Sequence, residues 1–115
     1  MRTLNDYFLT AKVTDISTAG STFVAVPDGG KIIKILTSIK NAISTANAAI
    51  TFEIGGTAVT GAAITVTQSG SAAGDVDTSE PTAANSVTEG GAIEIITDGG
   101  SSTACEMMVT FVIRR

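Results

Sequence analysis

The sequence lacks histidine and tryptophan and has one cysteine, one tyrosine and four phenylalanines among 115 residues. Without histidine, the chain cannot form a Ser–His or Cys–His pair for nucleophilic catalysis, and the zinc sites built on His and Cys are excluded. A single cysteine cannot form a disulfide within the chain, which excludes a disulfide-stabilised secreted module. These absences exclude many common classes of hydrolase and metalloenzyme.

The chain also has few charges. Charged residues make up 16% of the sequence, and 11 acidic against 7 basic side chains give a formal net charge of −4. Apolar residues separate Lys31, Lys34 and Lys40, so no basic cluster is present of the kind that binds phosphate backbones. We therefore expect no nucleic-acid partner.

No apolar run approaches the roughly 18 residues of a membrane-spanning helix. The opening MRTLNDYFLTAKV places Asn5 and Asp6 where a signal peptide would have its apolar core. We therefore expect no membrane partner, and we expect the chain to be made and folded in a cytoplasm.

The remaining polar residues do not form a recognisable catalytic or binding motif. Asp75, Asp77 and Glu80 could begin a cation site, but they lack the pattern of a calcium loop, and a solvated acidic loop is the favoured interpretation. Glu53 and Glu94 both alternate outward from apolar neighbours, and nothing in the sequence brings them together as a glycosidase pair. We expect no catalytic residue, no metal and no cofactor, and we expect that the protein is not an enzyme. Cys105, in the apolar run ACEMMVTFVI, is predicted to be a small buried side chain.

What the sequence does contain is alternation of apolar and polar residues with a period of two. It is clear in YFLTAKV, AITFEI, AIEII and ACEMMVTFVI, and Gly, Asp, Pro and Ser turns separate such segments. About eight strands in a chain of this length predict one all-β domain, residues 1–115, folded as an antiparallel β-sandwich or barrel. The segment SIKNAISTANAAI (38–50) could form a helix, but a strand end followed by a connection is favoured.

One connection is unusually long. Residues 67–91, TQSGSAAGDVDTSEPTAANSVTEGG, contain almost no large apolar side chain. Loops beyond about 15 residues are uncommon in compact domains and are usually functional or disordered. A disordered linker is one interpretation. Because the two strands after Gly91 must return to the same sandwich, we favour a loop that crosses or caps the domain or reaches a neighbouring subunit.

The order of the turn motifs supports a more specific expectation. The chain resembles a family of small structural proteins of tailed bacteriophages in the order of FVAVPDGGKIIKILTSI, ITFEIGGTAVTG, ITVTQSGSAAGDVDTSEPTAANSVTEGGAIEIITDGGSS and a last strand ending in Arg. The resemblance runs from Ser21 to Arg115. It implies a head decoration (cement) protein, which is a β-sandwich or jelly-roll module, often trimeric, on the capsid exterior.

If the resemblance holds, the partners are other copies of the chain in a homotrimer and the major capsid protein, and the location is the outside of a virion assembled in the host cytoplasm. The N-terminal segment 1–7 and the loop 69–90 are the expected contact elements. The candidate interface residues are Arg2, Tyr7, Ser69, Ala73, Asp75, Pro81 and Asn85.

Two other functions stay open at this point. A tail-fibre, head-fibre or surface sandwich could bind host glycans, although the scarcity of aromatic side chains argues against a stacking platform for sugars. A stand-alone bacterial β-domain is the third possibility. Strand order also stays open between a jelly-roll-like arrangement, which we favour, and an immunoglobulin-like one.

Overall fold

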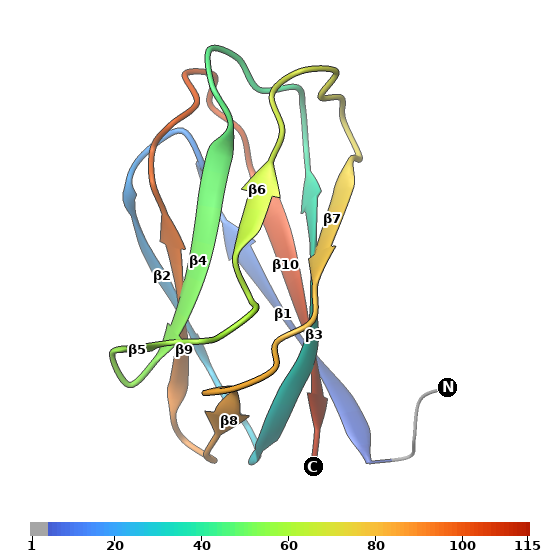
Figure 1. Ribbon diagram of the computed structural model, residues 1–115, viewed down its shortest axis with the longest axis vertical. Coiled ribbons are helices and arrows are strands. Elements are labelled where there is room, and N and C mark those ends of the chain that lie inside the picture. Colours follow the sequence, from blue (N-terminus) through green and yellow to red (C-terminus); the bar gives the residue numbers. More distant parts are fainter. Residues whose placement is uncertain (1–4) are drawn as a thin grey trace.

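The computed structural model describes residues 5–115, which form ten strands and no helix, so this part of the chain has no helix that could cross a membrane. The strands make two five-stranded antiparallel sheets that pack face to face (Figure 1). This confirms the predicted all-β antiparallel sandwich, with ten strands where about eight were expected. The strands are β1 Asp6–Val13, β2 Gly20–Ala25, β3 Gly30–Ile39, β4 Ala48–Ile54, β5 Thr57–Ala58, β6 Ile64–Val66, β7 Val76–Ser79, β8 Ser86–Val87, β9 Ala92–Thr97 and β10 Met107–Arg114.

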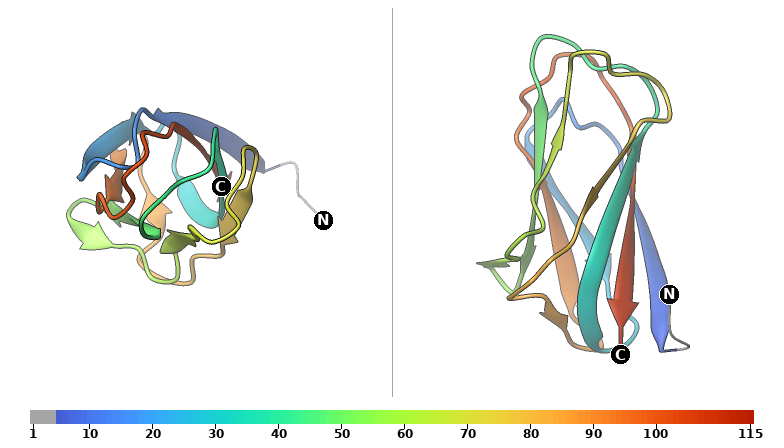
Figure 2. Two further views of the ribbon diagram at one scale, coloured as in Figure 1. Left: turned by 90° about the horizontal axis from the view of Figure 1, so that it is seen from above. Right: turned by 45° about the vertical axis from the view of Figure 1, so that its right-hand side comes forward.

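The first half of the chain pairs with the second half in a nested order. Strand β1 pairs with β10, β2 with β9, β3 with β7 and β8, and β4 with β5 and β6. Successive pairs lie alternately in two sheets, which we name sheet A (β1, β10, β3, β7, β8) and sheet B (β2, β9, β4, β5, β6). The chain is thus a long antiparallel ribbon rolled up on itself, as the view down the long axis shows (Figure 2).

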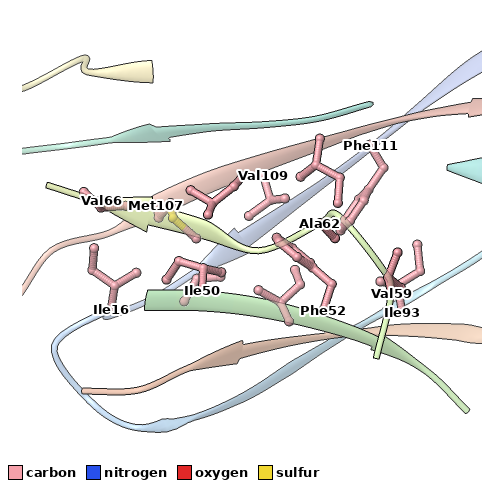
Figure 3. Close-up of a cluster of buried hydrophobic side chains, with 14 of the residues drawn as sticks. Ile16, Ile50, Phe52, Val59, Ala62, Val66, Ile93, Met107, Val109 and Phe111 are labelled. Atoms are coloured by element: carbon pink, nitrogen blue, oxygen red, sulfur yellow. The ribbon is translucent and has the colours of Figure 1, made fainter. Parts of the chain in front are cut away.

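The alternating segments bury the side chains that their pattern predicts. From β10, Met107, Val109 and Phe111 point into the core, where they meet Ile50 and Phe52 of β4 (Figure 3). The rings of Phe52 and Phe111 pack edge to face, with centroids 5.7 Å apart and planes at 87°, an arrangement that aromatic pairs prefer.

The connections nearest this core also behave as predicted. The Cys105 side chain is buried in the same cluster, as expected. The favoured interpretation of residues 38–50 is also confirmed, because β3 ends at Ile39, β4 begins at Ala48, and no helix lies between them.

Residues 67–91, expected to be one long loop that crosses or caps the domain, contain two short strands. They cross from sheet B to sheet A and contain β7 and β8, both of which pair with β3. Strand β7 lies at the edge of sheet A, with Thr78 and Val76 exposed. A strand in that position needs backbone partners on one side and little apolar burial, so its polar sequence carries no alternation to detect.

The two ends of the described chain meet the β2–β3 turn. The Tyr7 hydroxyl donates a hydrogen bond to the backbone carbonyl of Asp28, whose carboxylate pairs with Arg115 (Nε–Oδ2 2.7 Å). Close by, Gly30 adopts φ +148°, and a Cβ there would lie 2.6 Å from the carbonyl oxygen of Arg114. Only glycine fits without displacing the end of β10.

The edge-to-face pair makes a prediction about stability. Replacing Phe52 with Ala leaves a cavity in the centre of the sandwich, and we expect the free energy of unfolding to fall by about 3–5 kcal/mol. Denaturant titration followed by circular dichroism, at low protein concentration, measures the change. Phe23→Ala is the matched control because the Phe23 side chain is 67% exposed, and its effect should stay within about 0.5 kcal/mol. Equal losses in the two variants would contradict this description of the core.

Candidate interaction surfaces

The loop end of the sandwich, opposite the C-terminus in Figure 1, is formed by the connections 40–47, 67–75 and 98–106. Hydrogen bonds tie these connections together. Ser71 Oγ accepts from the backbone N–H of Ile43 (3.0 Å), and the N–H of Ser102 donates to the carbonyl of Ser44 (3.0 Å). The 67–75 connection is therefore held against its neighbours and does not extend away as an arm.

Three of the predicted interface residues lie in this connection. Ser69, Ala73 and Asp75 are all exposed. Ser69 and Asp75 line one hollow of about 220 Å³, together with Asp77. Burial, with the nearby Asp75 carboxylate, raises the pKa of the Asp77 carboxyl. Within residues 5–115, no group of three or more Cys, Asp or Glu side chains is placed to hold a metal ion.

The other candidate residues serve the fold where the structure describes them. Pro81 is buried, and Asn85 binds Ile32 twice, through its side-chain amide (2.7 Å) and its backbone carbonyl (2.9 Å). The Arg115 guanidinium lies 4.8 Å from the centroid of the Tyr7 ring. Burial, and to a smaller extent the negative charge of Asp28, raises the pKa of the Tyr7 hydroxyl. Arg2 lies outside the described residues, as does most of the segment 1–7. The role of these residues as intersubunit contacts stays a prediction.

The outer face of sheet A combines apolar and basic side chains. Strand register places Lys12, Met108, Ser38 and Val76 in one row across the sheet. Met108 is 42% exposed and Val76 is 59% exposed. The next row along the strands consists of Thr10, Thr110, Leu36 and Thr78. The row after it consists of Phe8, Val112 and Lys34. At the end of the sheet that carries the C-terminus, a hollow of about 460 Å³ is lined by Gly30, Lys31, Ile33, Ser86, Val87, Arg114 and Arg115.

The outer face of sheet B is acidic. Register places Phe23, Glu94 and Glu53 in one row, so the two glutamates are directly opposite each other on adjacent strands. The Phe23 side chain is 67% exposed, and Ser21 Oγ donates to Glu94 Oε2 (2.6 Å). All three side chains of the row border a hollow of about 360 Å³, whose lining includes Gly55, Gly56 and Val87. The structure describes every residue in the five strands of this sheet, and none is Lys or Arg.

The sequence identifies Glu53 and Glu94 as outward-facing residues, but it does not predict that they lie side by side. The alternation shows that each one points outward. It does not show which strand lies beside which. The missing information is the pairing of β4 with β9, two strands that are far apart in the chain.

Comparisons with known proteins identify a shared fold. No protein-family model matches the chain, and no curated protein matches it by sequence. A chain in the acidic stable capsid structure of Helicobacter pylori bacteriophage KHP30 is 11% identical and superimposes with a TM-score of 0.60 over 96% of this chain and 87% of that one. A chain in the cyanophage Pam1 capsid asymmetric unit is 15% identical and superimposes with a TM-score of 0.43 over 94% of this chain and 83% of that one.

The opposed glutamates make a second prediction. Like charges directly across a strand pair are destabilising, whereas opposite charges stabilise. We expect Glu53→Lys to raise the free energy of unfolding by about 0.2–1 kcal/mol, and the gain should shrink at high salt. Denaturant titration at low protein concentration measures it. Thr65→Lys, at an exposed position of β6 in the same sheet and opposite Ala49, is the control and should give no gain. A Glu53→Lys variant that is no more stable than the parent at low salt would contradict the repulsion.

Proposed function

We propose that this protein is a structural component of a tailed-bacteriophage virion, and that it decorates the outside of the head as a cement protein. The observation that carries the proposal is the fold shared with a chain of the KHP30 capsid structure, which spans 96% of this protein. The family resemblance of its turn motifs, from Ser21 to Arg115, supports the same class independently of the superposition.

The strand order supports a jelly-roll classification within this proposal. Four strands in the order β1-β10-β3-β7 face four in the order β2-β9-β4-β6, with β8 and β5 as short additions at the edges. Each strand of the first half pairs with its counterpart from the second half, and the pairs alternate between sheets. That nested order is expected when a double-stranded ribbon is rolled into a two-sheet jelly roll.

The proposed activity is mechanical and does not require catalysis. A module that touches two or more capsid subunits adds binding free energy that is lost when those subunits separate. Specific contacts typically bury about 800 Å² on each partner, and repetition over a lattice strengthens even modest affinities through effective concentration. A chain that has no histidine and whose single cysteine is buried fits a role that depends on contact with other subunits.

The assembly that we propose is a homotrimer around a threefold axis, bound to the major capsid protein on the exterior of a head that forms in the host cytoplasm. The contact elements are segment 1–7 and segment 69–90. Within the second segment, Ser69, Ala73 and Asp75 support this assignment because they are exposed on a loop end that hydrogen bonds hold in place. A preorganised surface loses little conformational entropy when it binds.

The head-stabilising role makes a third prediction. Heads assembled by the virus after deletion of this gene should release their DNA at a lower temperature than complete heads, and the purified protein should restore the difference. Dye fluorescence during heating measures the release. Ala73→Arg, which places a large charged group on the proposed contact, should restore less. Ala63→Arg is the matched control, because Ala63 is exposed outside both contact segments, and it should restore fully.

Two results would overturn the proposal. The first is mass spectrometry of purified virions that detects no copy of the chain. The second is DNA release at the same temperature from heads with and without it.

A further inference from the structure

The two outer faces of the sandwich carry opposite uncompensated charge. On sheet A, Arg114 pairs with Asp6 (Nε–Oδ1 2.8 Å), whereas Lys31 and Lys34 form no ion pair within residues 5–115. On sheet B, Glu53 and Glu94 form no ion pair in the same part of the chain, and no basic side chain lies on any of its strands. Each face therefore presents a charge that the other could neutralise.

Exposed apolar groups accompany both charges. On sheet B, Phe23 is 67% exposed beside the glutamate pair. On sheet A, Met108 and Val76 are exposed, and the hollow near Lys31 has Ile33 and Val87 in its lining. A single exposed apolar side chain is ordinary. An aromatic side chain flanked by charges, together with an apolar hollow flanked by the opposite charges, has the anatomy of an interface.

From this complementarity we infer that the occupant of each face is a second copy of this chain. The outer face of sheet B of one copy docks on the outer face of sheet A of the next. Phe23 enters the hollow lined by Ile33 and Val87, while Glu53 and Glu94 oppose Lys31 and Lys34. Exposed charges of this kind steer the association and set which faces meet.

The charges also disfavour a symmetric contact in which two copies meet through the same sheet face. Two copies joined through sheet B would bring two glutamate pairs together, and two copies joined through sheet A would bring Lys31 and Lys34 toward their equivalents. Like charges across an interface are costly, whereas the sheet A–sheet B contact neutralises both faces. Such a contact is heterologous, so it repeats from copy to copy, and in the proposed homotrimer it closes into a ring of three.

This inference rests on the self-association included in the proposed function and does not depend on capsid binding. Its five principal residues, Phe23, Lys31, Lys34, Glu53 and Glu94, lie outside segments 1–7 and 69–90. The inference therefore moves the contact between copies from those two segments to the sheet faces, and it leaves the loop end, with residues 69–75, for the shell.

Sedimentation velocity over a range of concentrations tests the inference with four samples of the full chain. The wild type should associate, and increasing salt should weaken its association. The double variants Glu53→Lys/Glu94→Lys and Lys31→Glu/Lys34→Glu should each associate at least about tenfold more weakly. Glu80→Lys/Glu89→Lys changes two exposed positions of segment 69–90 and alters the net charge as the first double variant does. Under this inference it associates like the wild type, whereas weaker association would assign the contact between copies to that segment.

Mixing the two charge-reversed interface variants gives the sharpest result. In Glu53→Lys/Glu94→Lys the changed positions make sheet B basic like sheet A, and in Lys31→Glu/Lys34→Glu they make sheet A acidic like sheet B. In the mixture, basic faces of the first variant can again meet acidic faces of the second. We therefore expect the mixture to form oligomers that neither variant forms alone, and this result also shows that both variants are folded. Phe23→Ala should weaken the association of the wild type by about tenfold or more without changing any charge.

Several outcomes would overturn the inference. They are a wild type that is monomeric at every concentration, a Glu53→Lys/Glu94→Lys variant that associates like the wild type, and a mixture that stays monomeric. Association lost only in Glu80→Lys/Glu89→Lys would also overturn it and would assign the contact to segment 69–90. None of these outcomes decides whether the chain binds a phage head, which the DNA-release experiment tests separately.

Discussion

Strand register is the constraint on which the rest of this structure depends. The pairing of β4 with β9 places Phe52 opposite Ile95 inside the sandwich and Glu53 opposite Glu94 outside it. A slip of one residue would expose the first pair and bury the second. The energetic penalty of that exchange is large, because buried apolar contacts would be lost and two carboxylates would be desolvated without partners. The hydrophobic core therefore fixes the position of the surface groups that we assign to interaction.

The same constraint explains how far the sequence predicts the fold. Alternation identifies the long strands, and it correctly predicts which side chains of β10 face inward, because burial of one face leaves a period of two in the sequence. It fails for β7 and β8, where a polar edge needs only backbone hydrogen bonds to β3. It is also silent on the Glu53–Glu94 pair, since no local pattern records that β4 and β9 are neighbours. Of the candidate interface residues in segment 69–90, Pro81 is buried and Asn85 hydrogen-bonds to Ile32, and their role as contacts stays a prediction.

The composition of the chain and the side chains on its surface both fit the structural role proposed above. Its reactive groups are few, its core consists mainly of aliphatic side chains, and its distinctive features lie on the outer faces of the sheets and at the loop end. Like charges directly opposite on paired strands are destabilising, so we expect the Glu53–Glu94 pair to lower the stability of a single copy, a local cost that proteins tolerate where function requires it. A protein whose role is to contact other subunits would retain this repulsion, because Lys31 and Lys34 of a neighbouring copy would neutralise the two glutamates. A decoration protein that joins both its own copies and the shell would use two separate sets of surfaces, which is the arrangement proposed for the sheet faces and the loop end.

The most direct test of this account is a cryo-electron microscopy map of the intact virion whose genome encodes the chain. The account predicts density for this sandwich on the outside of the head, with residues 69–75 against the shell and with sheet B of each copy facing sheet A of a neighbour. Density in which the loop end and both sheet faces contact only solvent would contradict it, as would a head surface from which the sandwich is absent.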